Sequence, residues 1–155
     1  MVVKNWITPQ VVQCSDEGMF EVIKEREVDA VLNVSHLSFF STPYEHIDEA
    51  HYKHLNVTND LPDFDYFLRE GLSWIEEHVQ KGERVCVHCW AGGNRSVTLA
   101  TAYLMWKGML FEQAYEKVTK DNPWLDVWDG VPRHLKLARP HNQERLKIWG
   151  GGELP

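Results

Sequence analysis

The sequence predicts a single α/β domain with a central, mostly parallel sheet flanked by helices. Short apolar runs suited to buried strands alternate along the chain with segments of helical periodicity, which is the pattern of α/β folds. The 155 residues are enough for one sizeable core, and no repeat, low-complexity tract or linker divides them. The strand at residues 85–87 leads through a Gly-rich loop into a helix, so a phosphate-binding loop is expected between strand and helix.

The strands are identified by their short apolar runs. The first run contains Pro9, which cannot donate to a β-ladder, so this strand is expected to be irregular and to lie at a sheet edge. The run at residues 28–34 is apolar enough for a central strand. The expected strands are residues 6–13, 28–34, 51–57 and 85–87.

The helices are identified by apolar periodicity and by their end signals. Ser15 and Asp16 can cap the first helix, and Gly82 and Gly108 follow the ends of two others. Residues 121–132 contain two prolines and predict a loop. The expected helices are residues 17–27, 64–79, 94–107, 111–120 and 141–149.

The loop after the fourth strand has the residues of an anion cradle. Gly92 and Gly93 let the backbone curl so that its amides converge, and the following helix adds unpaired N–H groups at its start. Arg95 supplies a planar fork of donors for two phosphate oxygens. Asn94 is expected either to brace the loop or to cap the helix. The expected phosphate-binding residues are Trp90, Ala91, Gly92, Gly93, Asn94 and Arg95.

Cys89 stands at the rim of this cradle. The positive potential that would hold a phosphate also stabilises a thiolate, and a thiolate facing a phosphoryl group is a nucleophile aimed at phosphorus. Ser96 can donate its hydroxyl to the sulfur and ease its departure from a phospho-cysteine. His88 is expected behind the loop, where a hydrogen bond from its ring would hold the loop and favour the thiolate.

The string His88-Cys89-x-x-Gly92-x-x-Arg95-Ser96 resembles the signature loop of the cysteine-dependent protein tyrosine phosphatase superfamily. Within it, the chain resembles a small dual-specificity phosphatase from about Trp6 to Trp149. The resemblance implies a catalytic domain over residues 1–149, followed by a short flexible tail at 150–155. It also implies hydrolysis of phosphotyrosine and phosphoserine or phosphothreonine through a cysteinyl-phosphate intermediate, without a cofactor.

A general acid is required because the leaving oxygen needs a proton as the ester bond breaks. Residues 56–60 resemble the family's general-acid loop, and Asp60 precedes Cys89 with one predicted helix between them. Asp60 is therefore the predicted acid, with Asp63 and Asp65 as nearby competitors. Asp63 is better placed to cap the following helix.

The three cysteines do not form a disulfide framework. Cys86 is interpreted as a buried strand cysteine, with a protective disulfide to Cys89 as the alternative. Among the eight histidines, His46, His51 and His54 lack zinc-like spacing, so no metal site is expected. A catalytic thiolate fits a reducing compartment, and no signal peptide or membrane span is visible. The expected location is cytoplasmic, or also nuclear if the source is eukaryotic.

The net charge of −7 argues against nucleic acid and anionic membranes as general partners. The resemblance implies a phosphorylated protein or peptide as the substrate. Three alternatives stay open. RNA 5′-phosphatases share an asparagine before the arginine, as in Asn94-Arg95, whereas phosphoinositide phosphatases often carry lysines in the loop, which this chain lacks. A catalytically silent phosphate-binding module is the third. The loops at 35–50 and 121–140 are expected to shape the rim of the site, with Trp124 and Trp128 in contact with substrate.

Overall fold

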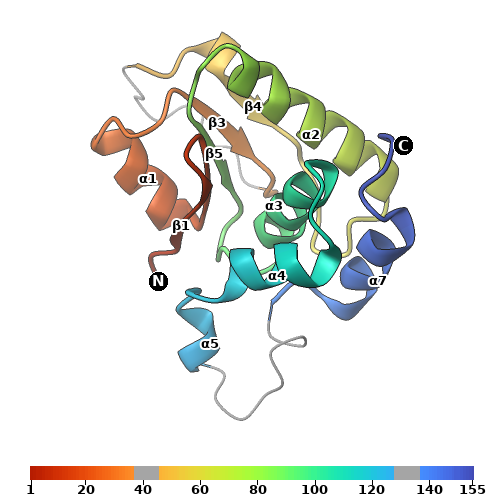
Figure 1. Cartoon of the computed structure of the whole chain (residues 1–155). Coiled ribbons are helices and arrows are strands. Elements are labelled where there is room, and N and C mark those ends of the chain that lie inside the picture. Colours follow the sequence, from red (N-terminus) through yellow and green to blue (C-terminus); the bar gives the residue numbers. More distant parts are fainter. Residues whose placement is uncertain (37–45, 128–136) are drawn as a thin grey trace.

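A five-stranded sheet forms the centre of the molecule (Figure 1). The computed structural model describes residues 1–36, 46–127 and 137–155. The strand order is β1-β2-β5-β3-β4; β2, β5, β3 and β4 run parallel, and β1 is antiparallel to β2. The mostly parallel sheet is confirmed. The strands are β1 (Lys4–Thr8), β2 (Val11–Cys14), β3 (Ala30–Asn33), β4 (Tyr52–His54) and β5 (Val85–His88).

The prediction of one irregular strand over residues 6–13 is wrong, because this segment belongs to a β-hairpin. The chain reverses at Pro9, where the Thr8 hydroxyl oxygen accepts hydrogen bonds from the backbone N–H groups of Gln10 (3.1 Å) and Val11 (2.9 Å). Proline fits this turn because it needs no ladder partner there. The expected edge position is correct for β1.

The five predicted helices are present, with ends that differ by a few residues. Ser15 caps α1 by accepting from the Gly18 N–H at 3.1 Å, and Asp63 caps α2 by accepting from the Tyr66 N–H at 3.1 Å. Two short helical segments were not predicted: η1, before β4, and α5, in a stretch expected to be a loop. The helices are α1 (Asp16–Lys24), η1 (Glu49–His51), α2 (Phe64–Gln80), α3 (Arg95–Trp106), α4 (Phe111–Thr119), α5 (Trp124–Val127) and α7 (Pro140–Trp149).

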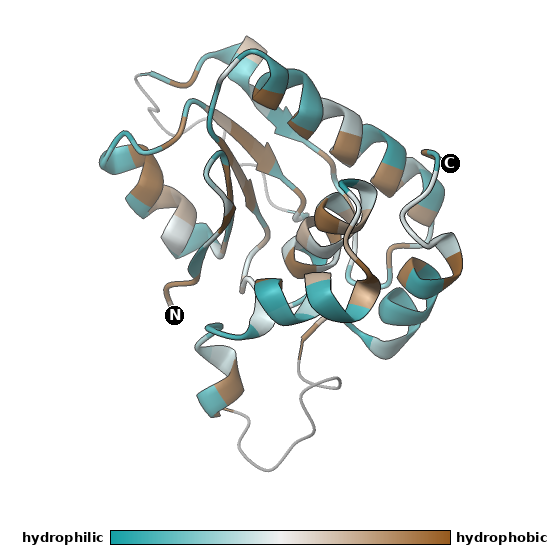
Figure 2. Ribbon diagram, in the orientation of Figure 1, coloured by the Kyte–Doolittle hydropathy of each residue, from teal (hydrophilic) through white to brown (hydrophobic). Residues whose placement is uncertain are grey.

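Helices cover both faces of the sheet (Figure 1). The larger core joins one face to α2, α3, α4 and α7, and the smaller core joins the other face to α1. In Figure 2 the hydrophobic stripe of α2 alternates with a hydrophilic outer surface, as expected for a helix packed on one side. Val85 and Val87 of β5 belong to the larger core, whereas Cys86 belongs to the smaller.

This alternation separates Cys86 from Cys89. The Cys89 side chain packs with the larger core, on the opposite face of the sheet from Cys86. Cys86 instead lies against Cys14, and both are buried free thiols. The interpretation of Cys86 as a buried strand cysteine is confirmed, and the two-sided arrangement gives no support to a Cys86–Cys89 disulfide.

The last residues contact the rest of the domain. The Trp149 indole N–H donates to the Glu153 carbonyl at 2.9 Å, and Leu154 packs against the larger core. The boundary between a catalytic domain at residues 1–149 and a short flexible tail at 150–155 remains a prediction.

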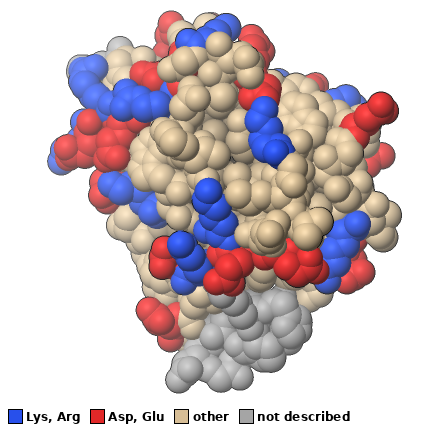
Figure 3. Space-filling model, viewed as in Figure 1, with Lys and Arg blue, Asp and Glu red and all other residues tan. Residues whose placement is uncertain are grey.

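Charged side chains of both signs are interspersed on the face shown in Figure 3, rather than gathered by sign. No described helix is long and apolar enough to cross a bilayer. Part of the two predicted rim loops, including Phe39, Phe40, Pro43, Tyr44 and Trp128, lies outside the described residues.

Candidate active site

The signature loop joins the carboxyl end of β5 to the start of α3. The strands β2, β3 and β4 end at the same edge as β5 because all four are parallel. Open parallel sheets bind their ligands at this edge. The loop therefore lies where both the sheet and the amino end of α3 favour an anion.

Four successive carbonyl groups of the loop accept hydrogen bonds from outside it. Since N–H and C=O of a peptide unit point in opposite directions, outward carbonyls leave the amides directed into the loop. Within the described part of the chain, no hydrogen bond uses an amide of residues 90–95 as its donor. The donors are the Asp16 N–H to Trp90 (3.0 Å), the Trp124 indole N–H to Ala91 (2.6 Å), the Asn122 amide to Gly92 (3.0 Å) and the Ala138 N–H to Gly93 (2.9 Å).

These outer donors were not predicted, because they come from segments far from the loop in sequence. The side chain of Asn122 is buried, and an asparagine just before Pro123 at a helix start has an ordinary local explanation. Only the folded chain shows that it supports Gly92.

The two glycines differ in their backbone requirements. Gly92 has φ +73°, and a Cβ there would come within 2.8 Å of the Ser15 backbone nitrogen. Gly93 has no positive φ, and its Cβ would meet the Leu137 side chain at an ordinary 3.6 Å. The expectation that both glycines are needed for the curl is thus supported for Gly92 alone.

Cys89 and Ser96 face one another at the base of the loop. Cys89 is only 2% exposed, and its sulfur lies 3.1 Å from the Ser96 hydroxyl oxygen. The Gln13 side-chain amide donates to that same oxygen at 2.8 Å. Because Ser96 accepts from Gln13, its own proton is available to the Cys89 sulfur or to the Cys14 carbonyl at 3.3 Å. Gln13, which was not predicted, thus orients the hydroxyl.

Arg95 is 4% exposed and is anchored from one side. Its Nη1 donates to the Val57 carbonyl at 3.0 Å and lies 3.4 Å from His36 Nδ1. Its Nε is buried without a partner among the described residues. Burial lowers the pKa of Arg95 below its ordinary value, and nearby Cys89 opposes this. The guanidinium thus keeps donors for a ligand beside the thiol.

Asp60 lies on the exposed rim, with 71% of its side chain accessible. Its carboxylate pairs with Arg139 Nη1 at 2.5 Å, and its carbonyl accepts from Arg145 Nη2 at 2.6 Å. Of its competitors, Asp63 is occupied as the α2 cap and Asp65 lies in the first turn of α2. The Asp63 carboxylate is thus taken up by the cap, whereas the Asp60 carboxylate is paired with Arg139.

Asn94 braces the loop and does not cap α3. Its side chain makes no capping hydrogen bond. Instead its amide donates to the Asn59 carbonyl at 2.9 Å, and its carbonyl oxygen accepts from the Arg139 N–H at 2.9 Å. Asn94 thus connects the signature loop to the segment of Asp60 and to the segment before α7.

His88 is buried behind the loop, and its Nδ1 lies 3.4 Å from the Cys89 carbonyl oxygen. Burial lowers the pKa of His88 to about 3, so the ring is neutral near pH 7. A neutral ring can support the loop through that carbonyl, but it supplies no positive charge to a thiolate.

A largely apolar cavity of about 340 Å³ adjoins the loop at Trp90 and Ala91. Trp90, 56% exposed, and Trp124 line it together with Asp16 and Glu17. Trp90 thus forms part of a pocket wall beside the loop.

Comparison with known proteins gives the family. Residues 11–139 match the family model described as dual specificity phosphatase, catalytic domain. The chain belongs to the dual-specificity phosphatase family. Its enzyme class is accordingly a hydrolase of the protein-tyrosine and dual-specificity phosphatase type.

Two relatives illustrate the match. Dual specificity protein phosphatase 22-B of Danio rerio is 33% identical over 135 residues, which cover 85% of this chain and 74% of that protein. Dual specificity protein phosphatase 1 of Arabidopsis thaliana is 34% identical over 77% of this chain. The match spans only 62% of the Arabidopsis protein's own length.

Solved structures show the same fold at low identity. Human DUSP28 superposes with a TM-score of 0.73 at 20% identity, covering 95% of this chain and 92% of that one. PTPMT1 in complex with PI(5)P gives a TM-score of 0.66 at 21% identity, covering 95% and 94%.

Proposed function

We propose that this chain hydrolyses phosphate monoesters of phosphotyrosine and phosphoserine or phosphothreonine in proteins, through a cysteinyl-phosphate intermediate. The observation that carries the proposal is the preorganised loop: four carbonyls are held outward around a cysteine that lies 3.1 Å from Ser96 and beside Arg95. Inward amides and a guanidinium stabilise the charge on the transferring phosphoryl group.

In the first step the Cys89 thiolate attacks phosphorus, forming the S–P bond as the P–O bond to the leaving group breaks. Asp60, released from Arg139, gives its proton to the leaving oxygen. Arg95 and the loop amides hold the three non-bridging oxygens throughout.

In the second step water attacks the phospho-cysteine, and its proton passes to Asp60. The O–P bond forms, the S–P bond breaks, and the electron pair returns to sulfur. Ser96, held by Gln13, donates a hydrogen bond to the leaving thiolate. Phosphate leaves and the starting state is restored.

A protein substrate is favoured over the alternatives by the surroundings of the loop. No lysine stands in the loop to meet an inositol phosphate, and the net charge of −7 opposes RNA. The cavity between Trp90 and Trp124 offers apolar walls to a side chain neighbouring the phosphorylated residue. These features support a phosphoprotein or phosphopeptide.

The test is phosphate release, with EDTA present, from matched phosphotyrosine, phosphothreonine and phosphoserine peptides, from phosphatidylinositol phosphate micelles and from 5′-triphosphorylated RNA. We expect peptide turnover that Cys89→Ser abolishes and Asp60→Asn lowers by about 100-fold. Acid quenching of Ser96→Ala during turnover of a labelled peptide should trap phosphate on the protein.

Each other outcome selects an alternative. Faster turnover of the lipid or RNA would replace the peptide as the substrate class. If the folded wild type binds phosphopeptide but hydrolyses none of the peptide, lipid or RNA substrates, the chain is a silent binding module. Turnover that persists in Cys89→Ser would contradict the cysteinyl-phosphate route itself.

A further inference from the structure

Two histidines and a glutamate from three segments meet at the amino end of the parallel strands. His51 ends η1 just before β4, His78 lies in the last turn of α2, and Glu83 precedes β5. One potential ligand atom of each lies within 4.8 Å of the others. The signature loop follows the carboxyl end of β5. This cluster therefore lies at the opposite end of the parallel strands from the loop.

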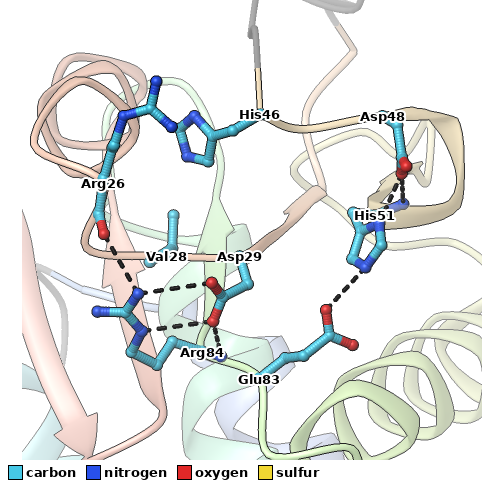
Figure 4. A pocket seen from close by; sticks show the side chains of 8 residues that line it. All are labelled: Arg26, Val28, Asp29, His46, Asp48, His51, Glu83 and Arg84. Carbon is cyan, nitrogen blue, oxygen red and sulfur yellow. Dashed lines mark hydrogen bonds and ion pairs between the residues drawn. The ribbon is translucent and has the colours of Figure 1, made fainter.

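The Glu83 carboxylate lies between the two imidazoles. Its Oε2 is 2.7 Å from His51 Nε2, and its Oε1 is 3.1 Å from His78 Nδ1 (His51 and Glu83 are seen in Figure 4). Ligands about 2.0–2.2 Å from a tetrahedral ion stand roughly 3.3–3.6 Å apart. The two separations from Glu83 are close to that spacing, so small side-chain movements would admit an ion.

Asp48 orients His51 as a carboxylate orients a metal-bound histidine. Its Oδ1 lies 2.5 Å from His51 Nδ1, and it also accepts from the His51 backbone N–H at 3.1 Å (Figure 4). His51 Nε2 lies 2.7 Å from Glu83 Oε2 and donates its proton to that carboxylate. With Nδ1 directed to Asp48, a metal ion would displace the Nε2 proton and bind the lone pair that it leaves. Metal-binding histidines commonly have such an outer carboxylate partner, because it fixes the tautomer and the ring.

The other two residues are held by the end of α2. The His78 side chain is only 3% exposed and packs against Trp74, with ring centroids 4.2 Å apart. The Glu83 N–H donates to the His78 carbonyl at 3.1 Å, across a turn in which Gly82 has φ +79°. The turn therefore fixes the spacing of His78 and Glu83.

A cavity of about 420 Å³ opens beside His51 and Glu83 (Figure 4). His46 lines it too, and its Nε2 is buried without a partner among the described residues. The cavity has room for a water molecule as a fourth ligand.

We propose that His51, His78 and Glu83 form a binding site for a divalent transition metal, with water completing the coordination. Two imidazoles and one carboxylate suit Zn²⁺, Co²⁺ or Ni²⁺, whereas Mg²⁺ and Ca²⁺ take oxygen ligands. The ion would join η1 and the short edge strand β4 to α2 and β5. Its function is to stabilise this end of the sheet, independently of the thiol chemistry at the other end.

The test is metal binding to the Cys89→Ser protein, which removes the catalytic thiol as a competing ligand. At a metal concentration 100-fold above Kd, we expect Zn²⁺ to raise Tm by roughly 5–10 °C. Co²⁺ should give visible d–d absorption without a sulfur-to-cobalt charge-transfer band. His51→Gln and Glu83→Gln should abolish both signals, and Asp48→Asn should weaken affinity about 10–100-fold.

Matched controls separate the site from nonspecific binding. Glu77→Gln changes an exposed carboxylate on α2, and His141→Gln changes an exposed histidine elsewhere; both should bind as the parent does. His78 is left intact because it is buried against Trp74. The proposal is overturned if the folded parent gives no Tm shift and no cobalt spectrum, or if His51→Gln and Glu83→Gln retain them.

Discussion

The signature loop depends on the backbone conformation of one residue, Gly92. Its φ of +73° suits glycine, and the Ser15 backbone leaves no room for a Cβ. Gly93, next in sequence, has neither restriction. The two positions therefore separate the effect of loop geometry from the effect of adding a methyl group to the loop.

Gly92→Ala is expected to lower kcat/KM for a phosphopeptide by about 100-fold, because a displacement of about 1 Å in the phosphate-holding groups costs that much. Gly93→Ala is expected to stay within a few-fold of wild type. Steady-state kinetics measures both, and circular dichroism checks that both variants fold. Equal losses in the two variants would show that backbone strain at Gly92 is not what matters.

At this scale, what the sequence could predict depended on distance along the chain. Cys89, Arg95 and Ser96 were identified together because the loop that holds them is contiguous. Gln13 contacts Ser96 across 83 residues, and no local pattern links them. The one available signal was a polar residue within the apolar run Val11–Cys14, where an uncompensated amide would be costly.

Among the structural elements, the acid segment, the signature loop and the segment before α7 are joined through Asn94. One side chain donates to the Asn59 carbonyl and accepts from the Arg139 N–H. Arg139 in turn pairs with Asp60. The position of the proposed acid relative to the thiol is thus set by contacts between elements.

Asn94→Ala is expected to lower kcat/KM for a phosphoserine peptide by about 10-fold or more, since two hydrogen bonds that position the acid segment are lost. The loss should be smaller for p-nitrophenyl phosphate, whose good leaving group needs less help from an acid. Asn94→Ser is the matched control. Serine is a good N-cap, so rescue by serine would indicate that capping matters, whereas we expect none.

The elements themselves were predictable where local signals agreed. For α2, an apolar stripe and a capping aspartate at Asp63 both predicted the helix. The β1–β2 hairpin was missed because Pro9 was interpreted as a flaw within one strand, although it lies in a turn. The single turn of α5 is too short for periodicity, and the Trp124 bond to Ala91 is long-range.

For the whole molecule, parallel strands direct two sets of side chains to opposite edges of one sheet. Residues that follow the strands build the signature loop, and residues that precede β4 and β5 build the His51, His78 and Glu83 cluster. The expectation of no metal considered only the spacing of neighbouring histidines. It could not include His78 or Glu83, because the turn after α2 and the pairing of β4 with β3 bring them to His51.

The stability of the whole domain should depend on pH through His88, which is fully buried at the end of the central strand β5. Burial lowers its pKa to about 3; the Cys89 carbonyl opposes this and His54 adds to it. The ordinary value is 6.5, so between pH 6.5 and 3 the unfolded chain binds a proton at this site that the folded chain does not. The stability linked to His88 is therefore complete above pH 6.5 and is lost as the pH falls below it.

At pH 5 this linkage amounts to about 2 kcal/mol relative to pH 7. Urea unfolding of wild type and His88→Asn at both pH values isolates it, because the other titrating groups are common to the two proteins. Asparagine keeps a donor for the Cys89 carbonyl but does not titrate. We expect the free energy of unfolding of wild type, relative to that of His88→Asn, to fall by about 2 kcal/mol between pH 7 and pH 5. If this difference in free energy of unfolding is the same at both pH values, His88 binds its proton as well in the folded protein as in the unfolded chain. That result would contradict its burial as a neutral ring.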